Sequence, residues 1–239
     1  MRRARFAPVR AGRGRRAPAG AAPGAGPERG ALPVSGLFDP LGLLIAAPGL
    51  LLALVLHEYA HARVAHHLGD PTPRAAGRLT LDPLAHLDPI GTLLLVLFGF
   101  GWAKPVPVNP WHFRNPLAGM ALVAAAGPAT NLALAFATFV IADLWEPTGL
   151  VGVAVRYVAI INVYLAVFNL IPIPPLDGSR VLRALLGRSG GWLDALESYG
   201  WLLLMLLLVT HTLDLVLHPL AALVMDGLAG LAAAMAGGR

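Results

Sequence analysis

Two histidines and a glutamate in the segment His57-Glu58-Tyr59-Ala60-His61 form the pattern H-E-x-x-H. On a helix, residues i and i+4 lie one turn apart on the same face, so both imidazoles can bind one metal ion. The intervening glutamate lies close to the open coordination position, where it can take a proton from water that the metal has made acidic. The pattern therefore predicts a zinc site with His57 and His61 as ligands and Glu58 as general base.

The motif lies at the end of an apolar run, residues 41–68, which is long enough to cross a bilayer core. An unpaired carboxylate is costly in such a run, so an ionisable residue there indicates a functional site. The alternative is a pair of histidines that only hydrogen-bond to neighbouring helices. The glutamate beside them favours metal binding.

A catalytic zinc usually has three protein ligands and one open position, so a third ligand must come from elsewhere in the chain. His67 would point away from the ion, because the motif lacks the following glycine that would turn the chain. Glu146 lies in a Trp-Glu-Pro turn between two apolar runs, and Glu197 begins another. His86 and Asp88, in the polar loop after the first run, stay possible ligands.

Asp177 is the strongest candidate for the third ligand. The prolines of segment 171–175 forbid a regular helix, so we expect an extended chain there. Irregular backbone at membrane depth is tolerated where it is buried in protein or lines a wet cavity. Gly178 allows close backbone packing beside the carboxylate. The alternative is that Asp177 only caps a helix that begins at Ser179.

The composition is that of an integral membrane protein. The chain has 239 residues, of which 56% are hydrophobic and 13% charged, whereas soluble domains carry about 25% charged residues. We therefore expect an all-α polytopic membrane protein, a bundle of about four to six transmembrane helices. The expected spans are 41–68, 117–144, 150–171 and 192–217, with 219–236 as a marginal fifth. Since there is no cysteine, thiolate metal sites and disulfides are excluded.

One apolar segment, residues 89–101, is too short to span as a helix. It is predicted to be re-entrant or interfacial. It follows a polar loop, residues 70–88, and precedes an extended stretch, residues 104–110. These three segments are expected to frame the entry of water to the site.

Residues 1–34 are rich in Arg, Ala, Gly and Pro and hold eight of the 18 basic residues. This composition cannot bury a core, so the segment is predicted to be a disordered tail. Residues 35–239 are then one membrane-embedded domain. The high net charge of +5 is no sign of nucleic-acid binding, because no fold or aromatic platform accompanies the tail.

Several motifs together resemble the site-2 protease family of intramembrane zinc metalloproteases. They are HEYAH on an apolar helix and, far downstream, FNLIPIPPLDGSRVL. The segments GDPTPRAAGRLTLDPLAHLDPIGT, FGFGWAKPVPVNP and AAGPATN are similar to the compact bacterial branch of that family. The resemblance runs from about residue 50 to residue 183. Many members carry PDZ or CBS domains, and this sequence shows neither.

The resemblance implies one zinc ion per chain, bound by His57, His61 and Asp177, with Glu58 as general base. It also implies that Asn169 and Asn131 help to bind the substrate. For both asparagines the alternative is hydrogen bonding between helices. The implied substrate is a transmembrane segment of another protein, partly unwound for cleavage in the bilayer. The sequence gives no indication of an oligomeric state.

The resemblance also implies a multi-pass protein of the cell membrane with its active site toward the cytoplasm. Most basic residues outside the tail then lie on the cytoplasmic side, as positively charged loops usually do. The arginines of the tail would lie outside, unless translation starts downstream or a non-crossing turn near Asp39 precedes the first span. Other possible functions are a peptidase of soluble or juxtamembrane peptides, a metal-handling transporter and a non-catalytic scaffold.

Overall fold

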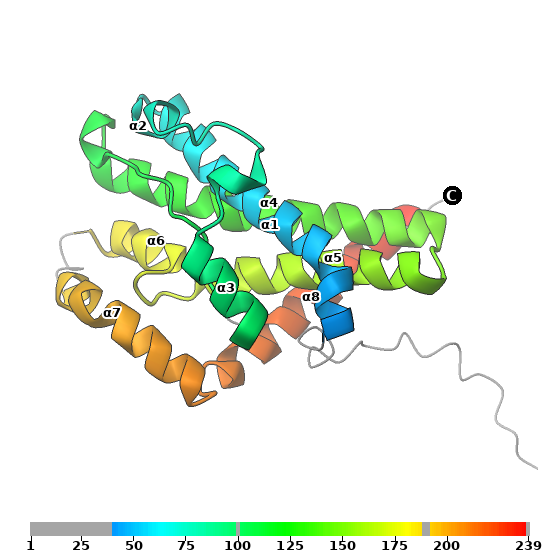
Figure 1. The fold of residues 1–239 in the computed structure, drawn as a ribbon. Coiled ribbons are helices and arrows are strands. Elements are labelled where there is room, and N and C mark those ends of the chain that lie inside the picture. The colour runs from blue at the N-terminus through cyan, green and yellow to red at the C-terminus, as the bar shows by residue number, and fades with distance from the viewer. Residues whose placement is uncertain (1–39, 99–100, 188–191, 238–239) are drawn as a thin grey trace, which may run out of the picture. The chain divides into compact units, whose positions relative to one another are not determined.

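The computed structural model describes residues 40–98, 101–187 and 192–237 (Figure 1). The chain divides into two units, 1–33 and 34–239, and the described residues all belong to the second. The predicted disordered tail lies outside the described residues. The regular elements of the described part are helices, with one isolated β-bridge.

Four helices in the described part are long and apolar enough to cross a membrane. They confirm the prediction of an all-α polytopic membrane protein. They are α1 (Pro40–His67), α4 (Pro116–Trp145), α5 (Gly149–Leu170) and α8 (Asp214–Ala236).

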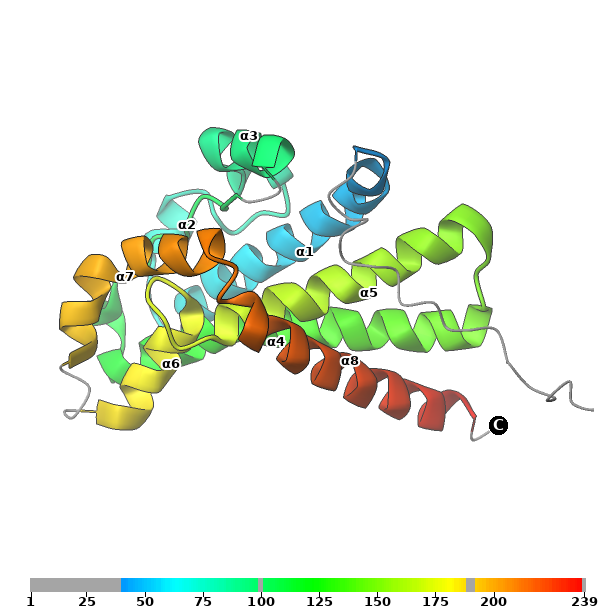
Figure 2. The ribbon, with the colours of Figure 1, turned by 90° about the horizontal axis from the view of Figure 1, so that it is seen from below.

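Helices α4 and α5 run antiparallel, and α1 packs across both (Figure 1). Small side chains make this close packing possible, since Ala53 and Ala62 of α1 and Ala124 of α4 are fully buried. Helix α8 runs obliquely along α4 and α5 (Figure 2). The bundle therefore places the His57–His61 face of α1 against α4.

Helix α1 ends where the sequence predicts. Gly69 has a φ of 106°, and the Asp70 N–H donates to the Ala65 carbonyl at 3.0 Å. A glycine in this conformation, followed by such a backward hydrogen bond, is a common helix end. The chain then turns sharply into the polar segment.

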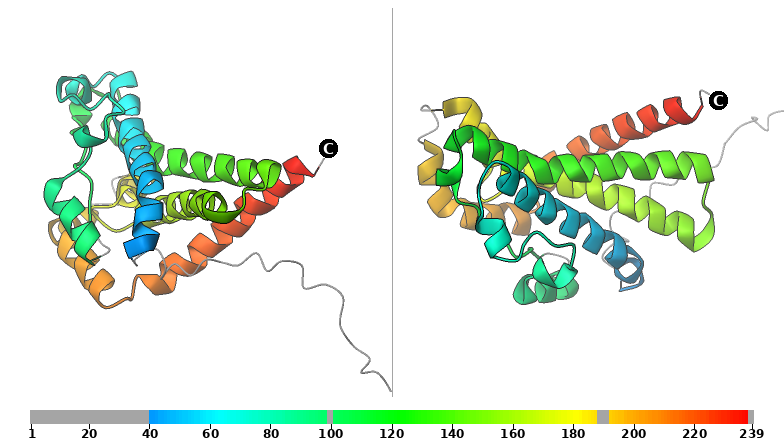
Figure 3. Two further views of the ribbon diagram at one scale, coloured as in Figure 1. Left: turned by 45° about the vertical axis from the view of Figure 1, so that its right-hand side comes forward. Right: turned by 90° about the horizontal axis from the view of Figure 1, so that it is seen from above.

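The segment after α1 contains short helices and irregular chain, and it lies to one side of the bundle (Figure 3). Leu87 pairs with Ala103 in the isolated bridge. Helix α3 presents Ile90, Leu93 and Val96 outward, and its 10 residues are too few to span a bilayer. The short helices are α2 (Thr72–Ala75), η2 (Pro83–Ala85), α3 (Pro89–Phe98) and η3 (Pro110–His112).

The expected span 192–217 is wrong, because the structure divides it. Helix α7 (Trp192–Val209) ends before a turn in which His211 has a φ of 55°. The Thr210 hydroxyl donates to the Leu206 carbonyl at 2.7 Å and so competes with continued helix. The stretch predicted as marginal is helix α8, which is long enough to span.

The chain between α5 and helix α6 (Asp177–Leu186) is irregular, as its prolines predict. It is not extended, however. It forms tight turns, in which the Ile173 N–H donates to the Ile171 carbonyl and the Leu176 N–H donates to the Ile173 carbonyl. Proline fixes φ near −65°, which suits turns as well as extended chain. Ile171 and Leu176 are buried against Leu204 of α7.

Candidate metal centre

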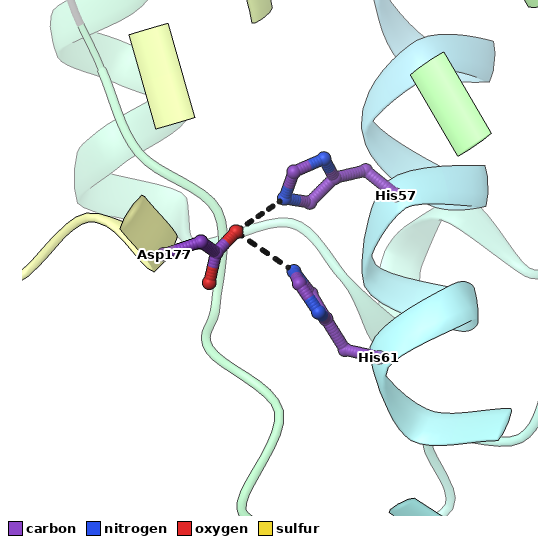
Figure 4. Close-up of side chains that lie close together, drawn as sticks. All are labelled: His57, His61 and Asp177. Atoms are coloured by element: carbon purple, nitrogen blue, oxygen red, sulfur yellow. Dashed lines mark ion pairs between the residues drawn. The ribbon is translucent and has the colours of Figure 1, made fainter. Parts of the chain in front are cut away.

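His57, His61 and Asp177 converge at one point of the bundle (Figure 4). The Asp177 Oδ2 atom lies 3.3 Å from the Nε2 atom of His57 and 3.2 Å from the Nε2 atom of His61. The three residues are only 5%, 8% and 7% exposed. Among the residues that the structure describes, this is the one group of three such side chains whose ligand atoms lie close enough to hold a metal ion.

The other ring nitrogen of each histidine, Nδ1, forms a hydrogen bond within the protein. The His61 Nδ1 atom lies 2.7 Å from the Val123 carbonyl oxygen, which can only accept a hydrogen bond, so Nδ1 carries the proton. In the neutral ring the Nε2 lone pair therefore faces the Asp177 carboxylate. Such an arrangement is stable only with a proton or a metal ion between the two groups.

The donor set fits zinc. Two imidazole nitrogens and one carboxylate oxygen are common zinc ligands in catalytic sites, which keep the fourth position open. Bonds of about 2.0–2.1 Å in a tetrahedron place ligand atoms about 3.3 Å apart, which matches the measured separations of 3.2 and 3.3 Å. Burial alone would raise the pKa of the Asp177 carboxyl, but its contacts with His57 and His61 hold that pKa well below its ordinary value.

Two glycines allow the backbone to approach this centre. A Cβ atom on Gly127 of α4 would lie 2.5 Å from the His61 Nε2 atom and 2.6 Å from the His57 Nε2 atom. A Cβ atom on Gly178 would lie 2.2 Å from the Leu170 carbonyl oxygen. Gly178 thus packs closely beside Asp177, as the sequence predicts. Gly127 was not among the predicted site residues, although it lies in the segment AAGPATN, which carries part of the family resemblance.

A cavity of about 340 Å³ lies beside the metal centre. Its walls are mostly apolar and come from α1, α3, the strand-like stretch around Ala103, α5, the 175–176 turn and α7. Glu58 and Asn169 both line it, next to His57. At one wall, the rings of Trp102 and Trp201 meet edge to face with centroids 5.3 Å apart. A cavity of this size and lining can hold an apolar part of a substrate.

Asn131 occupies a different position from Asn169. It is fully buried behind His57, with its Oδ1 atom 2.6 Å from the His57 Nδ1 atom, and it does not line the cavity. Its amide nitrogen lies 2.8 Å from Oδ1 of Asn162, a residue that the sequence analysis did not select. In the sequence, the available signal was an asparagine within an apolar run.

The other candidates for the third ligand lie elsewhere. His86 is fully buried, with its Nε2 atom 2.8 Å from the Thr80 carbonyl oxygen. The Asp88 carboxylate accepts a hydrogen bond from the Gly91 N–H at 2.8 Å, near the start of α3. His67, Glu146 and Glu197 are exposed.

Known proteins are similar in sequence to this chain. The sequence model of peptidase family M50 matches residues 148–210. A Bacillus subtilis protein named "Putative zinc metalloprotease YwhC" is 41% identical over 199 residues, which make up 77% of this chain and 89% of that protein. This chain belongs to peptidase family M50.

Further relatives of this M50 peptidase carry the same description in their names. Rip2 of Mycolicibacterium smegmatis is 31% identical over 181 residues, 72% of this chain and 69% of that protein. MJ0611 of Methanocaldococcus jannaschii is 30% identical over 146 residues, 61% of this chain and 73% of that protein. No solved structure matches the chain.

The family and the donor set both agree with the zinc metalloprotease that the motifs of the sequence imply. The M50 peptidase is an enzyme, a zinc metalloprotease. With four long apolar helices in the part of the chain that the structure describes, it is a multi-pass membrane protein.

Proposed function

We propose that this M50 peptidase is an intramembrane protease that hydrolyses peptide bonds in or near the transmembrane segments of other membrane proteins. The observation that carries the proposal is the position of the candidate metal ligands. The His57–His61–Asp177 group lies partly on α1, an apolar helix of spanning length, and directly beside a largely apolar cavity. A peptidase for soluble peptides has no need of such surroundings.

In this proposal His57, His61 and Asp177 hold one zinc ion. When bound, zinc supplies a Lewis acid that polarises a carbonyl and makes water acidic enough to lose a proton near neutral pH. Asp177 contributes the only negative charge of the three ligands. Since all three side chains are buried, they arrive at the centre already oriented and exclude bulk water from one side of it.

Glu58 acts as general base. Its carboxylate takes a proton from the attacking water, whose oxygen bonds to the scissile carbonyl carbon. The carbon–nitrogen bond then breaks, and Glu58 passes the proton to the departing amine nitrogen. Glu58 lines the same cavity as His57, so a substrate carbonyl in the cavity lies within reach of both. The products are a carboxylic acid and an amine, which ionise at neutral pH to a carboxylate and an ammonium group, and Glu58 returns to its starting state.

The substrate in this proposal lies partly unwound in the cavity. A regular helix pairs its own backbone N–H and C=O groups. Unwinding frees these groups, so the bound strand must find polar partners in the protein. Asn169 lines the cavity, and an amide side chain can pair with such a strand. The apolar walls suit the aliphatic and aromatic side chains that make up most transmembrane segments.

We further propose that the centre opens toward the cytoplasm. The segment that follows the C-terminal end of α1, residues 69–115, carries Arg74, Arg78, Lys104 and Arg114. Loops rich in lysine and arginine favour the cytoplasmic side of a membrane. The same side would then admit the water that hydrolysis consumes.

The test compares the wild type with Glu58→Gln in detergent or nanodiscs. One substrate is a tagged single-span protein whose apolar segment carries a central Asn-Gly pair. The other is a short soluble peptide with the same central sequence. We expect one zinc per chain in both proteins and cleavage of the single-span substrate by the wild type. The variant should cleave at least about 100-fold more slowly, as expected for loss of a general base.

Three results would contradict the proposal in different ways. Undiminished cleavage by Glu58→Gln would exclude Glu58 as the base. Cleavage of the soluble peptide alone would indicate a peptidase of soluble substrates. Stoichiometric zinc without cleavage of either substrate by the wild type would favour a metal-handling protein or a scaffold.

A further inference from the structure

Two asparagines lie fully buried where α1, α4 and α5 meet. Asn131 belongs to α4 and Asn162 to α5, and neither has any exposed surface. All three helices are long and apolar enough to cross a membrane. A buried amide in such surroundings is costly unless its polar atoms find partners. The described contacts provide those partners in one continuous chain.

The chain of hydrogen bonds ends at a metal ligand. The Asn162 Nδ2 atom donates to the Val158 carbonyl oxygen at 2.8 Å. The Asn131 Nδ2 atom donates to the Asn162 Oδ1 atom at 2.8 Å and to the Ala53 carbonyl oxygen at 3.1 Å. The Asn131 Oδ1 atom lies 2.6 Å from the His57 Nδ1 atom.

The backbone sets the direction of every bond in this chain. A carbonyl oxygen can only accept, so the amide group that faces Val158 must be the Asn162 nitrogen. The Asn162 oxygen then faces Asn131 and requires a donor. The Ala53 carbonyl oxygen also faces the Asn131 amide and likewise requires a donor there. The Asn131 nitrogen satisfies both, which leaves the Asn131 oxygen facing His57.

We propose that Asn131 and Asn162 form a relay that fixes the tautomer of His57, with Nδ1 protonated and Nε2 free to bind the metal. The Asn131 oxygen can only accept, so His57 Nδ1 must donate, and the lone pair of the neutral ring lies on Nε2. This is the nitrogen that faces Asp177 at 3.3 Å. Asn131 and Asn162 are therefore positioning residues, since neither belongs to the group that could hold the ion.

The relay does for His57 what a backbone carbonyl does for His61. His61 Nδ1 donates directly to the Val123 carbonyl oxygen at 2.7 Å. At the His57 Nδ1 atom the acceptor is a side chain, the Asn131 oxygen. The orientation of that oxygen is set by the Val158 carbonyl through Asn162 and by the Ala53 carbonyl directly. Partners on the outer nitrogen of a histidine ligand commonly fix its tautomer and ring orientation.

This inference rests on the proposed role of His57 as a zinc ligand, and the experiment separates the two. The first measurement is the zinc dissociation constant in detergent, from competition with a chelator. Asn131→Leu should weaken zinc binding by about 10- to 100-fold, as expected when a ligand's outer partner is lost. Asn162→Leu should weaken it by about 10-fold, because Ala53 still orients Asn131.

Asn162→Asp is the matched rescue variant. A neutral aspartic acid donates its O–H to the Val158 carbonyl and accepts from Asn131 with its other oxygen, and an ionised one still accepts. We therefore expect zinc affinity within about twofold of the wild type, since the direction of the relay is kept. Thr138→Val is the control for loss of a polar group in α4, because the Thr138 hydroxyl bonds only within its own helix, to the Leu134 carbonyl. It should leave zinc affinity unchanged.

The second measurement needs no zinc. In the metal-free protein with ¹⁵N-labelled histidine, the His57 signal is assigned from its loss in His57→Gln. We expect Nε2 to be unprotonated in the wild type and in Asn162→Asp. In Asn162→Leu we expect a mixture of tautomers, because the Ala53 carbonyl alone orients the Asn131 amide less strictly than Ala53 and Asn162 do together. If Asn131→Leu does not fold, the two Asn162 variants still carry the test.

The outcomes are distinct. Unchanged zinc affinity and an unchanged His57 tautomer in Asn162→Leu would overturn the relay, even if the melting temperature fell, and the asparagines would then only join helices. Zinc affinity undiminished by His57→Gln would instead overturn the ligand assignment in the proposed function. Loss of affinity in Asn162→Leu with rescue in Asn162→Asp would support the relay.

Discussion

The metal centre and the outer wall of the cavity lie side by side but are held in different ways. The His57–His61 face of α1 packs against α4 and α5, whose helical backbones satisfy their own polar groups. In the described part of segment 69–112, which forms the wall, α3 is the longest helix and the other regular elements are single turns. The wall is held by two buried charged side chains, Arg78 and Asp70, which bond to backbone groups.

These two side chains connect parts of the segment that are distant in sequence. The Arg78 guanidinium donates to the carbonyl oxygens of Ala85 at 2.7 Å and of Lys104 and Pro105 at 3.0 Å each. It is only 4% exposed. The Asp70 carboxylate accepts from the Asn109 N–H at 2.7 Å.

The difference suggests that metal binding and substrate binding can be disturbed separately. Changes among the helices should alter zinc affinity, whereas changes in the wall should alter substrate binding and local opening. We expect the wall to be the less stable part, because its short helices pack less extensively on the bundle than the long helices pack on one another. Four substitutions test this separation.

The largest effect is expected for Asp177→Asn, which removes the only negative ligand of the proposed set. Structural zinc sites bind with about 10–16 kcal/mol, so the loss of one of three ligands should weaken zinc binding at least about 100-fold. Zinc retention after dialysis checks this. Glu197→Gln and Glu146→Gln are matched controls, because both residues were candidates for the third ligand. Weaker zinc binding in either control, with normal binding in Asp177→Asn, would refute the assignment.

A somewhat smaller effect is expected for Gly127→Ala. The new Cβ atom would meet both imidazoles at 2.5–2.6 Å, so the rings or α4 must move. Displacement of ligands by a neighbouring group should reduce zinc affinity by about 10- to 100-fold. The control is Gly227→Ala in α8, where a Cβ atom meets nothing within 4 Å. Unchanged zinc affinity in Gly127→Ala would show that the helical region yields more easily than we infer.

Arg78→Met should act on the wall and leave zinc affinity unchanged. It keeps the apolar stem but leaves three carbonyl oxygens without their donor, which should cost about 1–3 kcal/mol of local stability. Hydrogen exchange at the Lys104 N–H, which is bonded to the His86 carbonyl at 2.8 Å, should become about 10- to 100-fold faster. The KM for the single-span substrate should rise. Arg74→Met is the control, since Arg74 is exposed. A loss of zinc from Arg78→Met would break the proposed separation.

The smallest effect is expected for Asp70→Asn and depends on pH. Burial alone would raise the pKa of Asp70, but hydrogen bonds from Thr72 and Asn109, with His112 nearby, hold that pKa below its ordinary value. The carboxylate therefore stabilises the fold fully above the unfolded pKa of about 3.9, and this stability is lost as pH falls toward the lower folded pKa.

Melting temperatures between pH 7 and pH 3 check this. Asp70→Asn should be less stable at pH 7, by about 1–3 kcal/mol, and should lose less stability than the wild type below pH 4. Asp82→Asn is the control, because the exposed Asp82 only caps η2 by accepting from the Leu84 N–H. Parallel pH curves for the wild type and Asp70→Asn would contradict the role of this carboxylate.

Much of the fold could be predicted from local patterns. The spans around α1, α4 and α5 follow from apolar runs, and the end of α1 follows from Gly69. The division between α7 and α8 was missed, because threonine and histidine are tolerated within helices and only the observed turn at Thr210 and His211 shows that they end one here. The prolines of 171–175 indicated irregular chain but could not distinguish turns from extended backbone.

The sequence by itself determined relations within single helices: the two imidazoles one helical turn apart, the glutamate between them, and the lengths of α1, α4 and α5. Helix geometry fixes such relations wherever the helix lies. Only the tertiary structure decided which distant carboxylate meets the imidazoles, and that Asn131 lies behind His57 while Asn169 lines the cavity. Those relations depend on how α1, α4 and α5 pack, and packing is settled by contacts between residues far apart in the sequence.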